Sequence, residues 1–192
     1  WETDQVGVSI YRGGVAITSP SSGDRLTATV NIASGSNLTI AVTVGARYDN
    51  SGSWGGVRCV MMAWNGSTAT RNLLFIGTSA GGVYVSSGVA GSSNQTATIG
   101  GINWSIPHRL VATHQQSNGA VKFYIDGVVV GSTTDTGTRP ALTEVTIGGI
   151  TGNGFGVSPA LVAMGDAMLS TDVWTSAQVV TDYLNARAAM GR

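Results

Sequence analysis

Cysteine is almost absent from this sequence, and long apolar runs are absent altogether. Cys59 is the only cysteine among 192 residues, so no disulfide can form within the chain. No apolar run approaches the roughly 18 residues that a membrane-spanning helix requires. We therefore expect a soluble protein that neither depends on a disulfide framework nor inserts into a membrane.

Charge is also scarce, and lysine is scarcest of all. Charged residues make up 10% of the chain, against roughly 25% in an average soluble protein. The formal net charge is zero, Lys122 is the only lysine, and the arginines are scattered along the sequence. A surface that binds nucleic acid needs clustered positive charge. The composition therefore excludes nucleic acid as an expected partner.

Glycine and short apolar stretches are abundant instead. Glycine contributes 28 residues, and hydrophobic residues make up 42% of the chain, which is enough to close one sizeable core. We predict a single domain over residues 1–192. Because the sequence starts at Trp1 without an initiator methionine, it is expected to be a processed form or a part of a longer protein.

The stretch from Arg109 to Ser132 predicts three strands joined by two tight turns. The dipeptides Asn-Gly at 118–119 and Asp-Gly at 126–127 tolerate the positive φ angles of a two-residue hairpin. Between them, apolar residues at 121, 123 and 125 alternate with polar or amphipathic ones. One face of this meander must therefore pack against a second sheet. For Asp126 we favour a role in the turn over a ligand contact.

Further short strands are expected on both sides of the meander, followed by one helix. Alternating or wholly apolar runs lie at 6–11, 15–20, 26–32, 38–48, 57–64, 73–77, 83–87, 96–99, 145–150 and 158–169. Short strands without a helical period between them favour a sandwich or barrel. Thr175 and Gln178 then have the spacing of a capping box, and apolar residues at 179, 180, 183, 184 and 188 predict a C-terminal helix packed on the sandwich.

From Arg109 onward the sequence resembles the laminin G-like branch of the concanavalin A-like lectin and glucanase superfamily. The resemblance rests on the strand HRLVATHQ, the run VKFYIDGVVVGS, the strand VTIGG and the segment ALVAMGDAMLSTDVW. It includes the tyrosine-x-aspartate-glycine hairpin at 124–127 and the Leu-Ser pair at 169–170. It implies an all-β fold, a jelly-roll sandwich of two antiparallel sheets with a short C-terminal α-helix. Ligands of such proteins are usually held on the concave sheet or by loops at one rim.

Acidic residues give little support for catalysis. The glucanases of this superfamily carry a Glu-x-Asp-x-x-Glu strand, because cleaving a glycosidic bond takes two facing carboxyl groups. Here Glu2 and Asp4 match only the first half of that pattern, and Glu144 is the only other glutamate. No Gly-x-Ser-x-Gly run stands in the strand-turn-helix setting that a nucleophile elbow requires either. We predict no catalytic residues and a protein that is not an enzyme.

The sequence also predicts no cofactor. His108 and His114 are the only histidines, and their spacing does not match a zinc site. Calcium is the better metal candidate, since aspartate and asparagine in loops at the rim suit it. However, no acidic loop of the EF-hand type occurs. We therefore predict no metal ligands.

Sugar binding requires flat aromatic faces beside amide or carboxylate groups. The loop ARYDNSGSWGG and the segment AWNG combine these residue types, and the turn NGFG adds a weaker candidate. The alternative for both Trp54 and Trp64 is a place in the core, since tryptophan buries a large apolar area. Trp174, ahead of the helix, is expected to anchor the core. The predicted ligand-binding residues are Tyr48, Asp49, Asn50, Trp54, Trp64, Asn65, Asn153 and Phe155.

The favoured function is a non-catalytic module that recognises a glycan or a protein surface within a larger extracellular or particle-borne assembly. A structural or decoration protein of a virus (phage) particle is the first alternative, suggested by the low charge and the small, uncharged residues. It would contact a capsid or similar lattice at the virion surface, and either role is compatible with a homo-oligomer. A polysaccharide-cleaving enzyme is the second alternative, and the missing glutamate argues against it.

Overall fold

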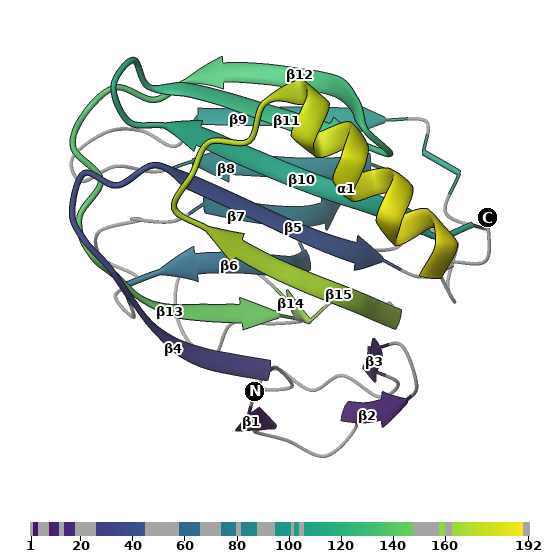
Figure 1. Ribbon diagram of the computed structural model, residues 1–192. Helices are drawn as coiled ribbons and strands as arrows, with labels where there is room; N and C mark the ends of the chain where they lie inside the picture. The colour runs from purple at the N-terminus through teal and green to yellow at the C-terminus, as the bar shows by residue number, and fades with distance from the viewer. Residues whose placement is uncertain are drawn as a thin grey trace.

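A computed structural model describes most of the expected strands and the helix. The described residues are 2–3, 8–11, 14–17, 26–44, 58–65, 74–79, 82–87, 95–100, 102–103, 106–147, 158–159 and 163–189. Two sheets stack face to face, and one helix lies on the outer face of the second sheet (Figure 1). The strand pairs of both sheets are antiparallel, apart from the short parallel pair of β14 and β6.

The first sheet has the strand order β1-β4-β13-β6-β7-β8-β9, with β14 pairing to β6 outside this path. Its strands are β1 (Glu2–Thr3), β4 (Leu26–Ile32), β6 (Arg58–Trp64), β7 (Leu74–Ser79), β8 (Gly82–Ser87), β9 (Gln95–Gly100), β13 (Leu142–Ile147) and β14 (Ser158–Pro159). In β6 the described side chains, at 60–64, are all buried. This confirms that the apolar run at 57–64 is a strand covered on both faces.

The second sheet has the strand order β12-β11-β10-β5-β15-β3-β2. Its strands are β2 (Val8–Tyr11), β3 (Gly14–Ile17), β5 (Leu38–Val44), β10 (His108–Gln115), β11 (Ala120–Ile125), β12 (Val128–Thr134) and β15 (Ala163–Ser170). The predicted meander is therefore β10, β11 and β12, at one end of this sheet. The meander continues into the rest of the sheet because β5 pairs with the other side of β10.

One of the two predicted turns has the expected form. Ile125 pairs with Val128, so Asp126 and Gly127 are the only residues between β11 and β12. Both have positive φ, 51° for Asp126 and 83° for Gly127. A two-residue turn with two positive φ angles is the hairpin turn that matches strand twist. The structural role predicted for Asp126 is thus confirmed.

The prediction of a two-residue turn at Asn118-Gly119 is wrong. Gln115 pairs with Ala120, which makes a four-residue loop from Gln116 to Gly119. Only Gly119 in this loop has positive φ, at 70°. The Asn118 carboxamide oxygen instead accepts a hydrogen bond from the Ala120 amide at 2.9 Å, a local bond that lets the wider loop close.

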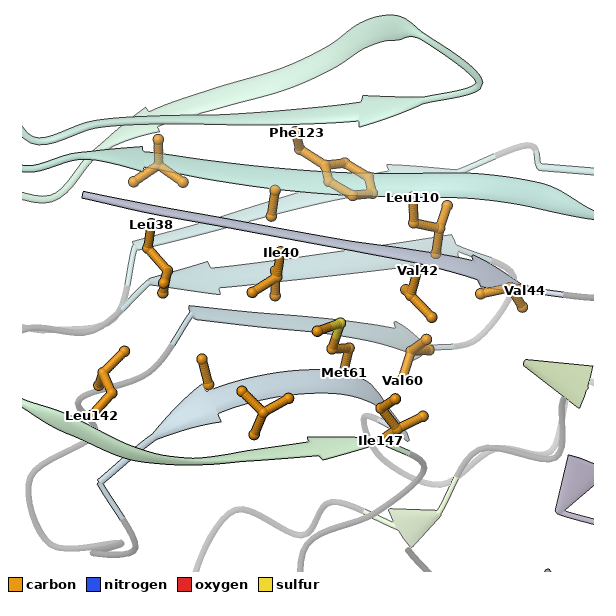
Figure 2. Packing of buried hydrophobic residues seen from close by; sticks show 14 of the residues in the cluster. Leu38, Ile40, Val42, Val44, Val60, Met61, Leu110, Phe123, Leu142 and Ile147 are labelled. Atoms are coloured by element: carbon orange, nitrogen blue, oxygen red, sulfur yellow. The ribbon is translucent and has the colours of Figure 1, made fainter. Parts of the chain in front are cut away.

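The hydrophobic core fills the space between the two sheets. Figure 2 shows apolar side chains of β5, β10 and β11 facing those of β6 and β13. The alternation predicted for β5 is confirmed, since Leu38, Ile40, Val42 and Val44 all point into this core. However, Thr39, Ala41 and Thr43 on the other face of β5 are buried as well. The outer face of this sheet is therefore also covered, and the helix covers part of it.

The C-terminal helix α1 spans Ser176–Ala189. Its capping box is confirmed, because the Thr175 amide donates to Gln178 Oε1 at 2.8 Å and the Gln178 amide donates to Thr175 Oγ1 at 3.3 Å. The predicted packing face is only partly correct. Val179 and Ala186 are buried, whereas Val180 and Leu184 are 42% and 54% exposed. The helix is turned so that Asp182 faces the sheet and binds Arg109.

Candidate functional site

Arg109 fixes helix α1 on the outer face of the second sheet. Its side chain, at the start of β10, is 1% exposed. Its Nε and Nη2 atoms donate to the two Asp182 carboxylate oxygens at 2.7 and 2.9 Å, while Nη1 donates to Thr43 Oγ1 at 3.1 Å and to the Asp166 carbonyl at 2.6 Å. The bidentate pair is the strong form of this contact. It links β10, β5, β15 and α1 at one point.

The helix covers only part of the sheet beneath it. Val179 packs on Ala41, Val111 and Tyr124. Tyr124 of β11 pairs with Val111 of β10, so this rung lies under the helix. The next rungs pair Thr113 with Lys122 and Gln115 with Ala120, and they lie beyond the start of α1.

A groove of about 540 Å³ occupies this uncovered part of the sheet. Its floor comes from β10 and β11, and its wall is the segment that leads into α1. The size falls within the range of roughly 300–1,000 Å³ that is typical of ligand sites. The lining residues are Asn37, Thr113, Gln115, Ala120, Lys122, Tyr124, Asp172, Val173, Trp174, Thr175 and Ser176.

The wall of the groove is held by one threonine of β5. The Thr39 hydroxyl donates to the Asp172 carbonyl at 2.7 Å and accepts a hydrogen bond from the Trp174 amide at 3.2 Å. Trp174 also packs on the cluster of Ala41, Val111 and Tyr124. The indole is therefore half-buried against the sheet, and its remaining surface lines the groove. The prediction that Trp174 anchors the core describes only one of its two contacts.

Two hydroxyl groups on the floor have no partner in the described part of the structure. The side chains of Thr113 and Tyr124 are each 1% exposed, and both line the groove. Among the described residues, neither hydroxyl makes a hydrogen bond. Because both side chains line the groove, a ligand or water in the groove can form hydrogen bonds with these hydroxyls.

One side chain of each sign lines the groove. The Lys122 side chain is exposed, and Asp172, on the opposite side of the groove, is also exposed. Neither forms an ion pair with a described residue. The groove thus combines aromatic surface, hydroxyls, amides and two separate charges.

The ligand-binding residues predicted from sequence lie mostly outside the described part of the chain. Only the Trp64-Asn65 pair can be placed, at the end of β6. Trp64 is 8% exposed, and its indole nitrogen donates to Glu144 Oε1 at 2.9 Å. This fits the alternative that its ring belongs to the core. Asn65 is half-buried beside it. The predicted residues outside the described ranges are Tyr48, Asp49, Asn50, Trp54, Asn153 and Phe155.

Sequence reasoning missed the groove because its residues are spread over distant segments. Each strand of the meander shows which residues face outward, but the pairing of Thr113 with Lys122 depends on the register of the hairpin. The useful signal was the run TDVWTS directly before the capping box, which places an aromatic residue at a helix start. The sheet face that meets this run is not visible in the sequence.

A separate group of ionisable side chains is buried near the same end of the β10–β11 hairpin as the groove. His114 Nε2 lies 3.3 Å from the Asp135 carbonyl, and both side chains, like that of Arg139, are at most 1% exposed. Burial lowers the pKa of His114 to about 4, and the positive charge of Arg139 acts in the same direction. Burial also lowers the pKa of Arg139 to about 10, opposed by Asp135. His114 is thus enclosed, and its imidazole is neutral at neutral pH.

His108 and Asp126 form a second polar contact with a structural role. His108 Nδ1 lies 2.8 Å from one Asp126 carboxylate oxygen, and the other oxygen accepts the Arg109 amide at 2.8 Å. His108 Nε2 lies 2.8 Å from the Asn103 carbonyl. These bonds tie the Asp126-Gly127 turn to the start of β10. No group of three potential metal ligands occurs among the residues that the structure describes.

Within the described ranges, α1 is too short and too polar to cross a lipid bilayer.

No protein-family model matches the chain, and no curated protein matches it either. Solved structures do. The binding domain of botulinum neurotoxin serotype G has a TM-score of 0.75 at 11% identity, over 97% of this chain and 46% of that chain. The CBM40 of a Ruminococcus gnavus IT-sialidase, bound to alpha2,3 sialyllactose, has a TM-score of 0.62 at 14% identity, over 82% of this chain and 98% of that chain. A SAP-like pentraxin from Limulus polyphemus has a TM-score of 0.60 at 18% identity, over 83% and 75%.

These similarities, together with the two antiparallel sheets, establish the fold class. The chain is an all-β jelly-roll sandwich with a short C-terminal helix. This fold agrees with the resemblance to the concanavalin A-like, laminin G-like domains that the sequence shows from Arg109 onward. At these identities the comparisons show the fold alone.

Proposed function

We propose that this chain is a non-catalytic recognition module that binds glycans in the groove beside α1. The observation that carries the proposal is the lining of the groove, which combines the Trp174 ring with the hydroxyls of Thr113 and Tyr124, neither of which bonds to a described residue. An aromatic face stacks on the C–H surface of a sugar, and hydroxyls and amides bond to its hydroxyl groups. The similar CBM40 structure, whose description names sialyllactose as its ligand, adds support from a protein of the same fold.

A non-catalytic role follows from the carboxylates of the groove. Asp172 is the only acidic residue of the lining in the part of the chain that the structure describes, whereas cleavage of a glycosidic bond needs a second carboxyl group across the bond. A module of this kind acts within a larger assembly and in an extracellular setting or on a particle surface. The loop with Tyr48 and Trp54 and the turn with Asn153 and Phe155 remain predicted contacts at the rim.

A glycan array tests the proposal, followed by calorimetry with the best ligand. We expect Trp174→Ala to weaken binding about tenfold or more, and Tyr124→Phe to weaken it roughly 2–10-fold by removing one hydrogen bond while keeping the ring. Trp54→Ala is the matched comparison, because it removes an indole from the other predicted site. Thermal unfolding of each variant checks that the fold is intact.

Two outcomes contradict the proposal. If the wild-type protein binds no glycan, glycan recognition is wrong. If Trp54→Ala abolishes binding while Trp174→Ala leaves it unchanged, the site is the loop at 46–56 and not the groove.

A role on a virus particle is the second candidate function. Several apolar side chains of β12 and α1 are exposed, among them Val128 at 64% and Leu184 at 54%. Exposed apolar side chains of neighbouring elements are typical of contacts with other protein surfaces. Co-sedimentation with purified particles tests this role, and a chain that stays in the supernatant at all concentrations argues against it.

A further inference from the structure

We infer that the groove prefers sugars that carry a carboxylate over neutral sugars. This inference rests on the proposed function and concerns the ligand class of the same site. The lining carries more positive than negative charge, and a neutral ligand has no charge to interact with this excess. Three observations establish this imbalance: the state of Lys122, the start of α1, and the place of Asp172.

Lys122 is the only lysine of the chain, and it lies on the floor of the groove. Its side chain is exposed and makes no ion pair with a described residue. Its strand neighbour Thr113 presents, at the same rung, a hydroxyl that bonds to no described residue. An ammonium group beside a free hydroxyl donor suits one carboxylate, which accepts a hydrogen bond from each.

The start of α1 adds positive potential to the wall. Thr175 and Ser176 line the groove, and the first turn of the helix contains no acidic residue. The capping box occupies the amide of Gln178. Among the described residues, the amides of Ser176 and Ala177 have no partner. A helix start carries a partial charge of about +0.5, which favours an anion.

Asp172 opposes this potential but does not cancel it. It is the only carboxylate among the described residues of the lining, and it is exposed, as Lys122 is, so water screens the two charges alike. The charges of Lys122 and Asp172 offset each other, and the helix start adds its partial positive charge. The lining therefore has a net charge of about +0.5. The Asp172 carboxylate and the hydroxyl oxygens of the lining can also accept hydrogen bonds from the remaining hydroxyl groups of a sugar. The lining therefore fits a polyhydroxylated ring with a single acid group.

A matched pair of glycans tests the inference. One oligosaccharide ends in glucuronic acid and the other is identical but ends in glucose. We expect the acid form to bind the wild-type protein about tenfold more tightly at 50 mM NaCl, and this ratio to shrink at 500 mM NaCl because salt screens charge pairs. Isothermal titration calorimetry measures both affinities.

Two variants assign the preference to the groove. Lys122→Gln should remove most of the preference for the acid form, measured as the ratio of the two affinities within the same variant. Arg187→Gln removes one positive charge from the last turn of the same helix, on an exposed side chain. It should keep the preference, so the two variants separate a local contact from a general charge effect.

The outcomes distinguish this inference from the proposed function. Equal affinity for the two glycans in the wild-type protein, or a preference that survives Lys122→Gln, overturns the inference and leaves glycan binding intact. Binding of neutral sugars alone on the array has the same meaning. If no glycan of either kind binds, the proposed function itself is wrong and the inference falls with it.

Discussion

Arg109 shows how one buried charge organises two layers of this protein. Its guanidinium group is enclosed between the sheet and the helix, and Asp182 supplies the compensating charge. Burying an arginine costs free energy unless the group is paired and fully hydrogen-bonded. The four hydrogen bonds of this side chain give each of its three nitrogens a partner, and two of them form the ion pair. The position of α1, and with it the wall of the groove, depends on this residue.

Removing the partner of Arg109 is expected to destabilise the protein strongly. Asp182→Ala leaves a buried guanidinium without its counter-charge, so the free energy of unfolding should fall by about 3–5 kcal/mol. Urea unfolding followed by circular dichroism measures the change. Arg187→Ala on the exposed part of the same helix is the control and should change it by no more than about 0.5 kcal/mol. A loss below about 1 kcal/mol for Asp182→Ala would mean that the pair does not hold the helix.

His114 makes stability depend on pH in a predictable direction. Its pKa is 6.5 in an exposed setting and about 4 in the folded protein. The unfolded chain therefore takes up a proton at a pH where the folded protein does not. Its contribution is complete above pH 6.5 and is lost as the pH falls toward 4, up to about 3 kcal/mol.

Urea unfolding at pH 7 and pH 4.5 measures this dependence. In His114→Gln the side chain cannot titrate, so the difference in free energy of unfolding between the two pH values should be smaller than in the wild-type protein. Identical differences in the two proteins would show that other groups cause the acid sensitivity.

At the scale of the element, two turns require glycine for different reasons: one for its φ angle alone, the other for its φ angle and for space. Gly35 and Gly119 have similar φ angles of 75° and 70°. A Cβ atom at Gly35 would meet only Thr138 Cγ2 at 3.8 Å, whereas one at Gly119 would lie 2.5 Å from the backbone oxygen of Asp135. The loop from Gln116 to Gly119 therefore needs glycine for space as well as for its φ angle.

Alanine substitutions at these two positions should differ in cost. Gly35→Ala should lower the free energy of unfolding by about 1–2 kcal/mol, the cost of a left-handed conformation. Gly119→Ala should cost clearly more, because the backbone must move to relieve the clash and the bond from the Asp135 amide to the Gly119 carbonyl, 2.7 Å long, is strained with it. Thermal unfolding of both variants measures the difference. Equal costs would mean that the hairpin loop adjusts freely.

At the scale of the whole molecule, the second sheet has central strands that are buried on both faces and an edge strand with exposed side chains. Every residue of β5 and all but the last of β10 are buried, whereas Val128, Val129 and Val130 of β12 are exposed. We expect amide hydrogen exchange to be slowest in 38–44 and 108–114 and much faster in 128–130. Exchange followed by mass spectrometry measures these rates. Similar protection across the sheet would mean that the edge strand is covered in solution.

The sequence predicted the sheets better than the layer outside them. Apolar alternation in β4, β5 and β11 has a period that is independent of the partner strand, so the core face could be predicted. The capping box at Thr175 and Gln178 is equally local. The burial of Thr39 and Thr43, the inward turn of Asp182 and the place of Trp174 result from the helix folding back over β5 and β10. Those contacts join residues far apart in the chain, which no local pattern encodes.

The candidate site could be predicted by residue type but not by position. Aromatic residues beside hydroxyls and amides were expected, and the groove has them. The tryptophan that was expected to fill the core, Trp174, lines the groove, while Trp64 is enclosed and bonded to Glu144. Tryptophan is large enough to serve either purpose, so its burial depends on the tertiary neighbours.

The place of β5 in the sheet has a consequence for how the protein is made. Thr39 of β5 bonds to Asp172, 133 positions later in the chain, and β15 supplies one whole side of β5. At a synthesis rate of roughly 5–20 residues per second, this partner is made about 7–27 seconds after β5. During that time the uncharged segment LTIAVTV has an open strand edge and no proline or charge to block pairing with other chains. We therefore expect nascent chains to be most prone to pair with one another until β15 and α1 have been synthesised.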